Sequence, residues 1–388
     1  MDKKKLEYIS YGFFIGAFTM IALLIVPFMK YKKIETKINF IADTFQENYY
    51  KEITDEDKEE IKQNIYSGLL SDYDIYSRYY TEKEYKEEME KQTHQYYGIG
   101  VQTKYSEEKH NYIVIDVLDN SPAYKGGLLK GDLIEAIDGV SASVVGITDF
   151  TDRLKGAENS VVTLDVLRDD EHLSLKIQRE AIEYPTVKYQ MIDTVGYIKL
   201  SSFATNSAEE FKEALTFMDN NNAQDIIVDL RNNIGGSVFV LEDICSLLFP
   251  SDILFYDVMK DGSKIEMSFK SDLSDCKYNI YVLVNHTSAS CSEIFASYIQ
   301  AKKFGVLIGE QTFGKGCTQD FMTFSDNTAF QYTKSYWETI DGKNIMNNGI
   351  YADYYCKDDK IDMFNYDIDR TNDLLLDYAL DVISDRDL

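Results

Sequence analysis

The feature that most constrains the fold is a regular alternation of short apolar runs and helical stretches after residue 184. Four nearly continuous apolar runs have the length of strands: Val195–Leu200, Ile226–Leu230, Ile280–Val284 and Val306–Ile308. Helical patterns separate them, near Ala208–Met218, Val238–Phe249 and Ser292–Lys302. Strands that are apolar on both faces belong to a sheet that helices cover on both sides. The pattern therefore predicts an α/β domain over residues 184–388.

The composition excludes several other classes of protein. With 388 residues the chain can form two or three folding units, and 44% apolar and 27% charged residues exclude wholesale disorder. The net charge of −26 repels phosphate backbones, so we expect no nucleic-acid partner. The five cysteines lack CxxC spacing and the four histidines form no i, i+4 pair, which indicates neither a metal site nor a disulfide framework. We expect buried thiols and no cofactor.

The N-terminus contains an uncharged run from Tyr8 to Met29 that is rich in Ile, Leu, Phe and Ala. As a helix this run is roughly 30 Å long, which matches the hydrocarbon core of a bilayer. A secretory signal peptide is the alternative, but it has a shorter apolar region and a small-residue cleavage site, which this run lacks. Lysines on both sides of the run do not decide its orientation. We predict an uncleaved transmembrane helix within residues 1–33, a cytoplasmic tip and an extracytoplasmic remainder.

Residues 34–96 combine many Glu and Lys residues with apolar residues at helical spacing: Ile34, Ile38, Ile41, Ile61, Ile65 and Leu69. The pattern predicts a helical segment and is typical of a helical cap or a dimerisation element. Its charges are typical of a solvated helix face. We therefore expect any homodimer to form through this segment, and we expect no catalytic residue in it.

Residues 97–183 show short strands with turn signals between them. The expected strands are Gly98–Gln102, Tyr112–Ile115 and Val161–Leu167. A helix start at Ser121-Pro122-Ala123, the run Gly131-Asp132-Leu133-Ile134 and a hairpin turn at Ile137-Asp138-Gly139 complete the pattern. This series resembles a PDZ domain. The resemblance implies that the loop Gly98-Ile99-Gly100-Val101 binds the terminal carboxylate of a peptide through backbone N–H groups, while the peptide adds to a sheet edge. The alternative is that these glycines only form a turn.

The stretch from Val284 to Ile294 joins a buried strand to a helix by a tight polar turn that contains Ser288, Ser290 and Ser292. A side chain there is exposed at the carboxyl end of the sheet, where α/β proteins form their sites. The helix N-terminus adds free N–H groups that stabilise an oxyanion. On its own, Ser290 with Glu293 three residues later is also a capping box, so this stretch alone leaves both interpretations open.

The stretch from Gly309 to Gln319 nearly matches a phosphate-binding P-loop but fails at Gly316, where Ser or Thr would bind Mg²⁺. The following residues, Gln319–Phe324, also predict a strand in place of the required helix. What remains is Lys315 among glycines and close to Phe313. Desolvation in such a setting lowers the pKa of a lysine and supplies the neutral amine that a general base needs.

Together the two stretches resemble the carboxyl-terminal processing peptidases, or tail-specific proteases, which are serine endopeptidases with a Ser–Lys dyad. The resemblance covers residues from about 34 to 355 and includes the segments Gly196–Phe203 and Asp229–Gly236. It implies a peptidase core with a mixed, ClpP/crotonase-like sheet. It further implies Ser290 as nucleophile, Lys315 as general base and Gln319 as the residue that orients the lysine amine.

The implied oxyanion hole consists of backbone N–H groups of Gly235, Gly236 and Cys291. The chain departs from the family at Ile234 and Ala352, where the family commonly has Pro, and at Cys291, where it commonly has Ala; none of these changes removes a catalytic side chain. His286 suggests a Ser–His pair, but no Asp or second motif supports it. The implied substrates are proteins or peptides with free C-termini. The alternative is a non-catalytic PDZ adaptor that binds tails and retains the fold.

Overall fold

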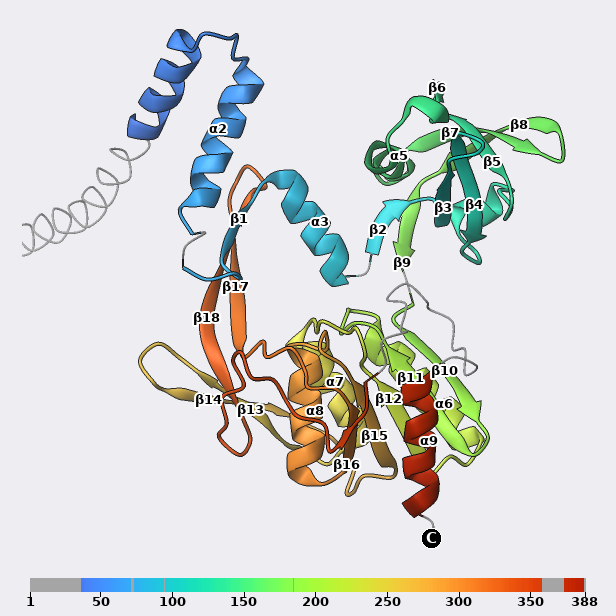
Figure 1. The fold of residues 1–388 in the computed structure, drawn as a ribbon, viewed down its shortest axis with the longest axis vertical. Coiled ribbons are helices and arrows are strands. Elements are labelled where there is room, and N and C mark those ends of the chain that lie inside the picture. The colour runs from blue at the N-terminus through green and yellow to red at the C-terminus, as the bar shows by residue number, and fades with distance from the viewer. Residues whose placement is uncertain (1–35, 71–72, 94, 184, 358–372, 387–388) are drawn as a thin grey trace, which may run out of the picture. The chain divides into compact units, whose positions relative to one another are not determined.

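The computed structural model describes residues 36–70, 73–93, 95–183, 185–357 and 373–386. The expected transmembrane run Tyr8–Met29 lies outside these ranges. Within them, no helix combines the length and the apolar character needed to cross a membrane. The chain divides into one unit of residues 1–85 and 319–333 and a second unit of residues 86–318 and 334–388 (Figure 1). The predicted boundaries at residues 33, 96 and 183 remain predictions.

The first unit contains the helical segment expected from the sequence, with one strand that the sequence pattern did not reveal. A helix over residues 36–48 precedes α2 (Asp55–Gly68). A capping box begins α2, because the Asp57 N–H donates to Thr54 Oγ1 (3.1 Å) and the Thr54 N–H donates to Asp57 Oδ2 (2.7 Å). Strand β1 (Arg78–Tyr80) pairs antiparallel with the start of β18 (Ala329–Thr339). The second segment of this unit is therefore held to the first by strand pairing.

The boundary between the units falls within α3 (Glu82–Thr93), whose residues from Lys86 onward belong to the second unit. After α3 the chain enters a sheet with the strand order β3-β4-β5-β7-β8. Its strands are β3 (Val101–Ser106), β4 (Asn111–Val117), β5 (Leu133–Ile137), β7 (Val161–Arg168) and β8 (Glu171–Gln178). Smaller elements are β2 (Gln95–Gly98), α4 (Pro122–Lys125), β6 (Val140–Ser141), η1 (Ala142–Val144), α5 (Ile147–Leu154) and β9 (Glu180–Glu183). This part has its own apolar core, in which the Phe150 ring stacks on Tyr112 at 3.6 Å between centroids.

Most local predictions for this region are confirmed. Ser121 caps α4 by accepting a hydrogen bond from the Tyr124 N–H (3.2 Å). Asp138 and Gly139 both have positive φ, as a two-residue hairpin turn between β5 and β6 requires. The expected strand Gly98–Gln102 is wrong, because β2 ends at Gly98 and β3 begins at Val101. Gly100 interrupts it with φ 73°, where an added Cβ would lie 2.5 Å from Ser121 Cβ.

The remainder of the second unit is built on a mixed sheet with the strand order β10-β11-β12-β15-β16-β19. Its strands are β10 (Val187–Ile192), β11 (Val195–Leu200), β12 (Asp225–Asp229), β15 (Asn279–Val284), β16 (Gly305–Gly309) and β19 (Tyr354–Tyr355). Within this sheet, the β10–β11 pair is antiparallel and the other described pairs are parallel. A further sheet contains β13 (Asp252–Val258), β14 (Lys264–Phe269) and the end of β18, while β17 (Cys317–Thr323) pairs with β18.

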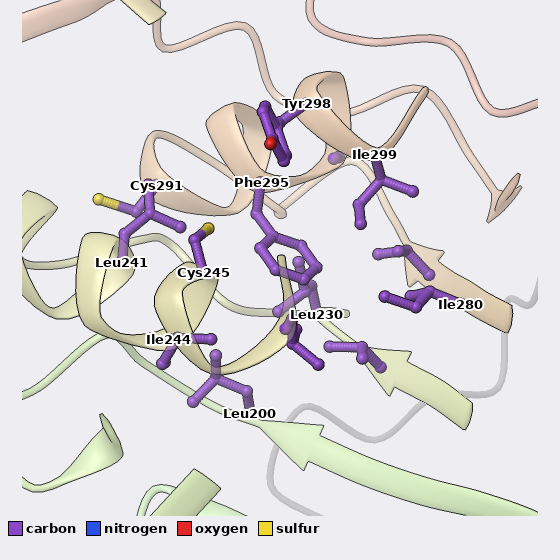
Figure 2. Packing of buried hydrophobic residues seen from close by; sticks show 14 of the residues in the cluster. Leu200, Leu230, Leu241, Ile244, Cys245, Ile280, Cys291, Phe295, Tyr298 and Ile299 are labelled. Atoms are coloured by element: carbon purple, nitrogen blue, oxygen red, sulfur yellow. The ribbon is translucent and has the colours of Figure 1, made fainter. Parts of the chain in front are cut away.

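Helices bury both faces of this mixed sheet, as the apolar strands predict. One apolar cluster joins one face to α6 (Ser207–Asn220), α7 (Val238–Leu248) and α8 (Cys291–Lys302). Another joins the opposite face to α9 (Leu374–Arg386). Figure 2 shows Cys291, Phe295 and Ile299 of α8, spaced four residues apart, turned towards α7 and the strands. The start of α8 is thereby fixed against the sheet.

Candidate active site

Three loops that carry the sequence motifs follow three neighbouring parallel strands. β12, β15 and β16 are adjacent, with Asp229 opposite Leu283 and Val284 opposite Gly309. The loops after these strands therefore meet at one edge of the sheet, the carboxyl edge. They contain the Gly235-Gly236 turn, Ser290 and Lys315 respectively.

Ser290 occupies the N-cap position of α8. Its backbone conformation is one that residues other than glycine rarely adopt. Its φ is 56° and its ψ is −116°. Such strain costs of order 1–3 kcal/mol and persists only where the surroundings hold it, most often at functional sites. Here the Ser290 N–H donates to Glu293 Oε2 (2.9 Å), and the preceding Ala289 N–H donates to the Asn233 carbonyl (3.0 Å). The Glu293 carboxylate therefore caps the helix start at Ser290, and the catalytic role of Ser290 stays a prediction.

The two glycines of the turn after β12 lie directly against the Ser290 loop. A Cβ on Gly235 would lie 2.8 Å from Ser290 Cβ and 3.0 Å from the Cys291 nitrogen, and a Cβ on Gly236 would lie 2.4 Å from the Phe203 carbonyl oxygen. The Gly235 N–H donates to Asn233 Oδ1 (2.8 Å). Of the three expected oxyanion donors, Gly235 is thus already engaged by a side chain. The N–H groups of Gly236 and Cys291 remain as the expected donors.

Cys291 follows Ser290 and is fully buried. Its Sγ contacts the Gly236 carbonyl oxygen at 3.2 Å. Burial raises the pKa of this thiol to about 12, although the charge of Lys315 acts in the opposite direction. Cys291 therefore remains a neutral thiol at neutral pH, and its influence on the site is through packing. Cys245 and Cys317 are buried as expected, whereas Cys276 and Cys356 are only partly buried.

The loop before β17 is held at several points around Lys315. The Phe313 N–H donates to the Ser288 carbonyl (3.0 Å), and the indole N–H of buried Trp337 donates to the Lys315 carbonyl (3.1 Å). The Lys315 N–H donates to Glu293 Oε2 (2.8 Å), the oxygen that also accepts from Ser290. The backbones of the two expected dyad residues are thus within hydrogen-bond reach of one atom.

The side chains around Lys315 differ in part from the sequence-based expectation. Lys315 is partly buried, but Phe313 is half exposed and does not form the closed apolar cover that the sequence suggested. Gln319 lies on β17 and is partly buried, in the unit that includes residues 319–333. Its expected contact with the lysine amine stays a prediction.

Sequence reasoning missed Glu293 as a site residue and considered it only as a cap. Its carboxylate is fully buried and accepts four hydrogen bonds, from Ser290 N, Lys315 N, Gly314 N and Thr312 Oγ1. Burial raises the pKa of Glu293, and these hydrogen bonds oppose the shift. A Glu three residues after a helix-start Ser was the available signal.

A buried ion-pair network supports the segment that leads into the glycine turn. Arg231 donates to both oxygens of fully buried Asp229 and to both oxygens of Asp373, the residue before α9. Tyr197 Oη also donates to Asp229 Oδ2 (2.5 Å). Burial tends to raise the pKa of Asp229, but the charge of Arg231 and these hydrogen bonds outweigh burial and lower it.

His286 is not placed for a Ser–His pair. Its side chain is 74% exposed, and its Nδ1 lies 3.0 Å from Glu310 Oε2. Across the described ranges, no group of three or more His, Cys, Asp or Glu side chains is arranged to hold a metal ion.

Two regions of the chain match known protein families. Residues 194–356 match the model of peptidase family S41, and residues 113–168 match the model of a PDZ domain. A CtpA-like serine protease of Staphylococcus haemolyticus is 28% identical over 320 residues, which cover 82% of this chain and 64% of that protein. A carboxyl-terminal-processing protease of Synechocystis is 32% identical over 263 residues, which cover 66% of this chain and 61% of that protein.

The chain thus spans less than two thirds of the length of these relatives. Among solved structures, an S41 protease of Bacteroides fragilis is 17% identical and has a TM-score of 0.52, with 82% of this chain and 88% of that chain covered. At this level of sequence identity the similarity shows a shared fold only. On its sequence matches, the chain contains a peptidase family S41 domain at residues 194–356 and a PDZ domain at residues 113–168.

Proposed function

We propose that this chain is a serine endopeptidase of the carboxyl-terminal processing type, anchored in a membrane by residues 8–29. The observation that carries the proposal is the meeting of Ser290, Lys315 and the Gly235-Gly236 turn at one edge of the sheet, with the first two held by a single carboxylate oxygen. This meeting supports the assignment of a nucleophile, a base and oxyanion donors to these residues.

The mechanism follows from the chemistry of these groups. Neutral Lys315 accepts the hydroxyl proton of Ser290 as the oxygen attacks a peptide carbonyl, and Gln319 accepts a hydrogen bond from the lysine amine. The N–H groups of Gly236 and Cys291 stabilise the oxyanion, at about 3–4 kcal/mol for a donor of this kind. Lys315 then protonates the leaving amine, and water hydrolyses the acyl-enzyme.

The PDZ domain is proposed to bind the C-terminal tail of the substrate. In the sheet order β3 is an end strand, so among the described residues only β4 pairs with it along the sheet. An extended peptide can add to such an edge, and the Gly98–Val101 loop stands at the start of β3, where the terminal carboxylate would lie. Both features support tail recognition by this domain.

We propose that residues 8–29 anchor the enzyme and that the peptidase domain lies on the extracytoplasmic side, since large domains after a membrane span are translocated largely regardless of charge. Any homodimer is proposed to use the helical segment 34–96. Phe40 (68% exposed) and Tyr50 (79% exposed) in and just after its first helix offer apolar surface for such a contact.

The test is incubation of the purified chain with an unstructured protein, alongside Ser290→Ala. We expect internal cleavage by the wild type and none by the variant, with both proteins folded by circular dichroism. Tail binding without any cleavage by the wild type would instead favour the adaptor alternative.

A further inference from the structure

Glu293 makes more contacts than a helix cap requires. To cap the helix, Glu293 needs only the hydrogen bond that its Oε2 accepts from the Ser290 N–H. The other oxygen, Oε1, accepts from Thr312 Oγ1 (2.6 Å) and from the Gly314 N–H (2.6 Å), which belong to a different loop. Those two contacts do nothing for α8 itself.

The four donors around Glu293 include the backbone of both proposed dyad residues. Ser290 N lies 2.9 Å and Lys315 N lies 2.8 Å from the same oxygen, Oε2. Burying a carboxylate costs free energy unless both of its oxygens accept hydrogen bonds. The four donors around Glu293 are therefore held in a narrow range of positions. A displacement of about 1 Å at a reacting group can cost on the order of a hundredfold in rate.

We propose that Glu293 is a positioning residue that joins the serine loop to the lysine loop and holds Ser290 and Lys315 at reacting distance. Thr312 is its partner in the lysine loop, since its buried hydroxyl donates to Glu293 and accepts from the Ile350 N–H (2.7 Å). The inference rests on the proposed function, because it assigns the role through the Ser–Lys dyad.

Glu293→Gln is the decisive change because it keeps the shape of the side chain. A glutamine has one acceptor oxygen and one NH₂ donor. Whichever way it turns, the NH₂ group faces two of the four donors, so glutamine cannot accept all four hydrogen bonds. In one orientation Ser290 N and Lys315 N lose their shared acceptor, and in the other Thr312 and Gly314 lose their contact with the serine loop. Thr312→Val removes the hydroxyl with little change of shape, and Thr312→Ser retains it.

The experiment measures kcat and KM of the full chain on an unstructured protein substrate, with hydrogen exchange of the peptides that cover residues 311–317. We expect Glu293→Gln and Thr312→Val to lower kcat at least tenfold with KM within threefold, and to speed exchange at Gly314 and Lys315. Thr312→Ser should remain within threefold of wild type. Glu310→Gln is the matched control, since its carboxylate contacts the exposed His286, and it should change neither readout.

Wild-type kcat in a folded Glu293→Gln variant, or unchanged exchange at residues 314–315, would overturn the proposal. If Glu293→Gln does not fold, Thr312→Val decides in its place, and an unchanged kcat there overturns the proposal equally. If the wild type cleaves nothing, the proposed function has failed, while the exchange measurement still decides whether Glu293 holds the two loops.

Discussion

At the scale of single residues, the site depends on positions where the backbone leaves no room for a larger side chain. Gly235 has φ 104° and lies against Ser290. Both its backbone conformation and the lack of space for a Cβ therefore require glycine at this position. Cys291 shows the opposite case, because its small side chain is buried and packs against its neighbours, while its backbone N–H is the expected oxyanion donor.

We expect Gly235→Ala to reduce kcat/KM at least a hundredfold while the protein stays folded. The new Cβ would lie 2.8 Å from Ser290 Cβ and must displace the nucleophile or the turn. Gly262→Ala is the matched control, since Gly262 also has positive φ (82°) but a Cβ added there would meet no atom within 4 Å beyond its chain neighbours. That variant should lose about 1 kcal/mol of unfolding free energy and no activity. Equal activity loss in both variants would contradict the steric explanation.

We expect Cys291→Ala to retain activity within about threefold, because a thiol with a pKa of about 12 is not ionised at neutral pH. Iodoacetamide at pH 8 should leave Cys291 of the folded protein unmodified, as peptide mapping can show. Loss of activity beyond a hundredfold in this variant, or rapid alkylation of Cys291, would mean that the assignment of the nucleophile to Ser290 is wrong.

At the scale of elements, the sequence predicted the strands and helices around the site closely. α6, α7 and α8 lie within one or two residues of the expected ranges, because apolar residues recur at helical spacing in each of them. β1 was missed because a strand of three residues is too short to show an alternation of apolar and polar residues. Glu293 was interpreted only as a cap because its partners Thr312 and Gly314 come from a distant loop, and no local pattern encodes that contact.

We expect Arg231→Met to destabilise the fold by about 3–5 kcal/mol at pH 7, since it leaves the buried Asp229 carboxylate without its counter-charge. In the wild type the lowered pKa of Asp229 adds stability that is present at neutral pH and lost as the pH falls through that pKa. In the variant Arg231 no longer offsets burial, so we expect the pKa of Asp229 to rise. Acid then protonates Asp229 in the folded state and lessens the loss of stability. Urea unfolding at pH 7 and pH 5 tests this, and a destabilisation that is larger at pH 5 would contradict it.

At the scale of the whole molecule, the proposed function assigns tail binding and bond cleavage to separate domains of one chain. The PDZ series and the S41 motifs could be recognised from sequence because glycine turns and strand ends fix them locally. The position of residues 319–333 with the N-terminal unit could not, since it depends on pairing between segments about 250 residues apart, such as Tyr79 with Phe330. Long-range pairing of this kind leaves no periodic signal.

We expect amidation of a substrate's C-terminus to raise KM or reduce activation, because it removes the carboxylate that the Gly98–Val101 loop is proposed to bind. Kinetics with matched free-acid and amide peptides measure the effect. The control is a variant of the peptide with an altered internal site, which should affect cleavage and leave tail binding unchanged. Equal kinetics for both C-termini would show that this domain recognises something else.

The measurement that tests the central claim most directly is the mass of the acyl-enzyme formed with an activated ester, followed by peptide mapping. We predict one acyl group on Ser290 in the wild type, none in Ser290→Ala, and acylation at least a thousandfold slower in Lys315→Ala at pH 7, since the serine then lacks its base. An acyl group on Cys291, or equal acylation rates in wild type and Lys315→Ala, would contradict the account.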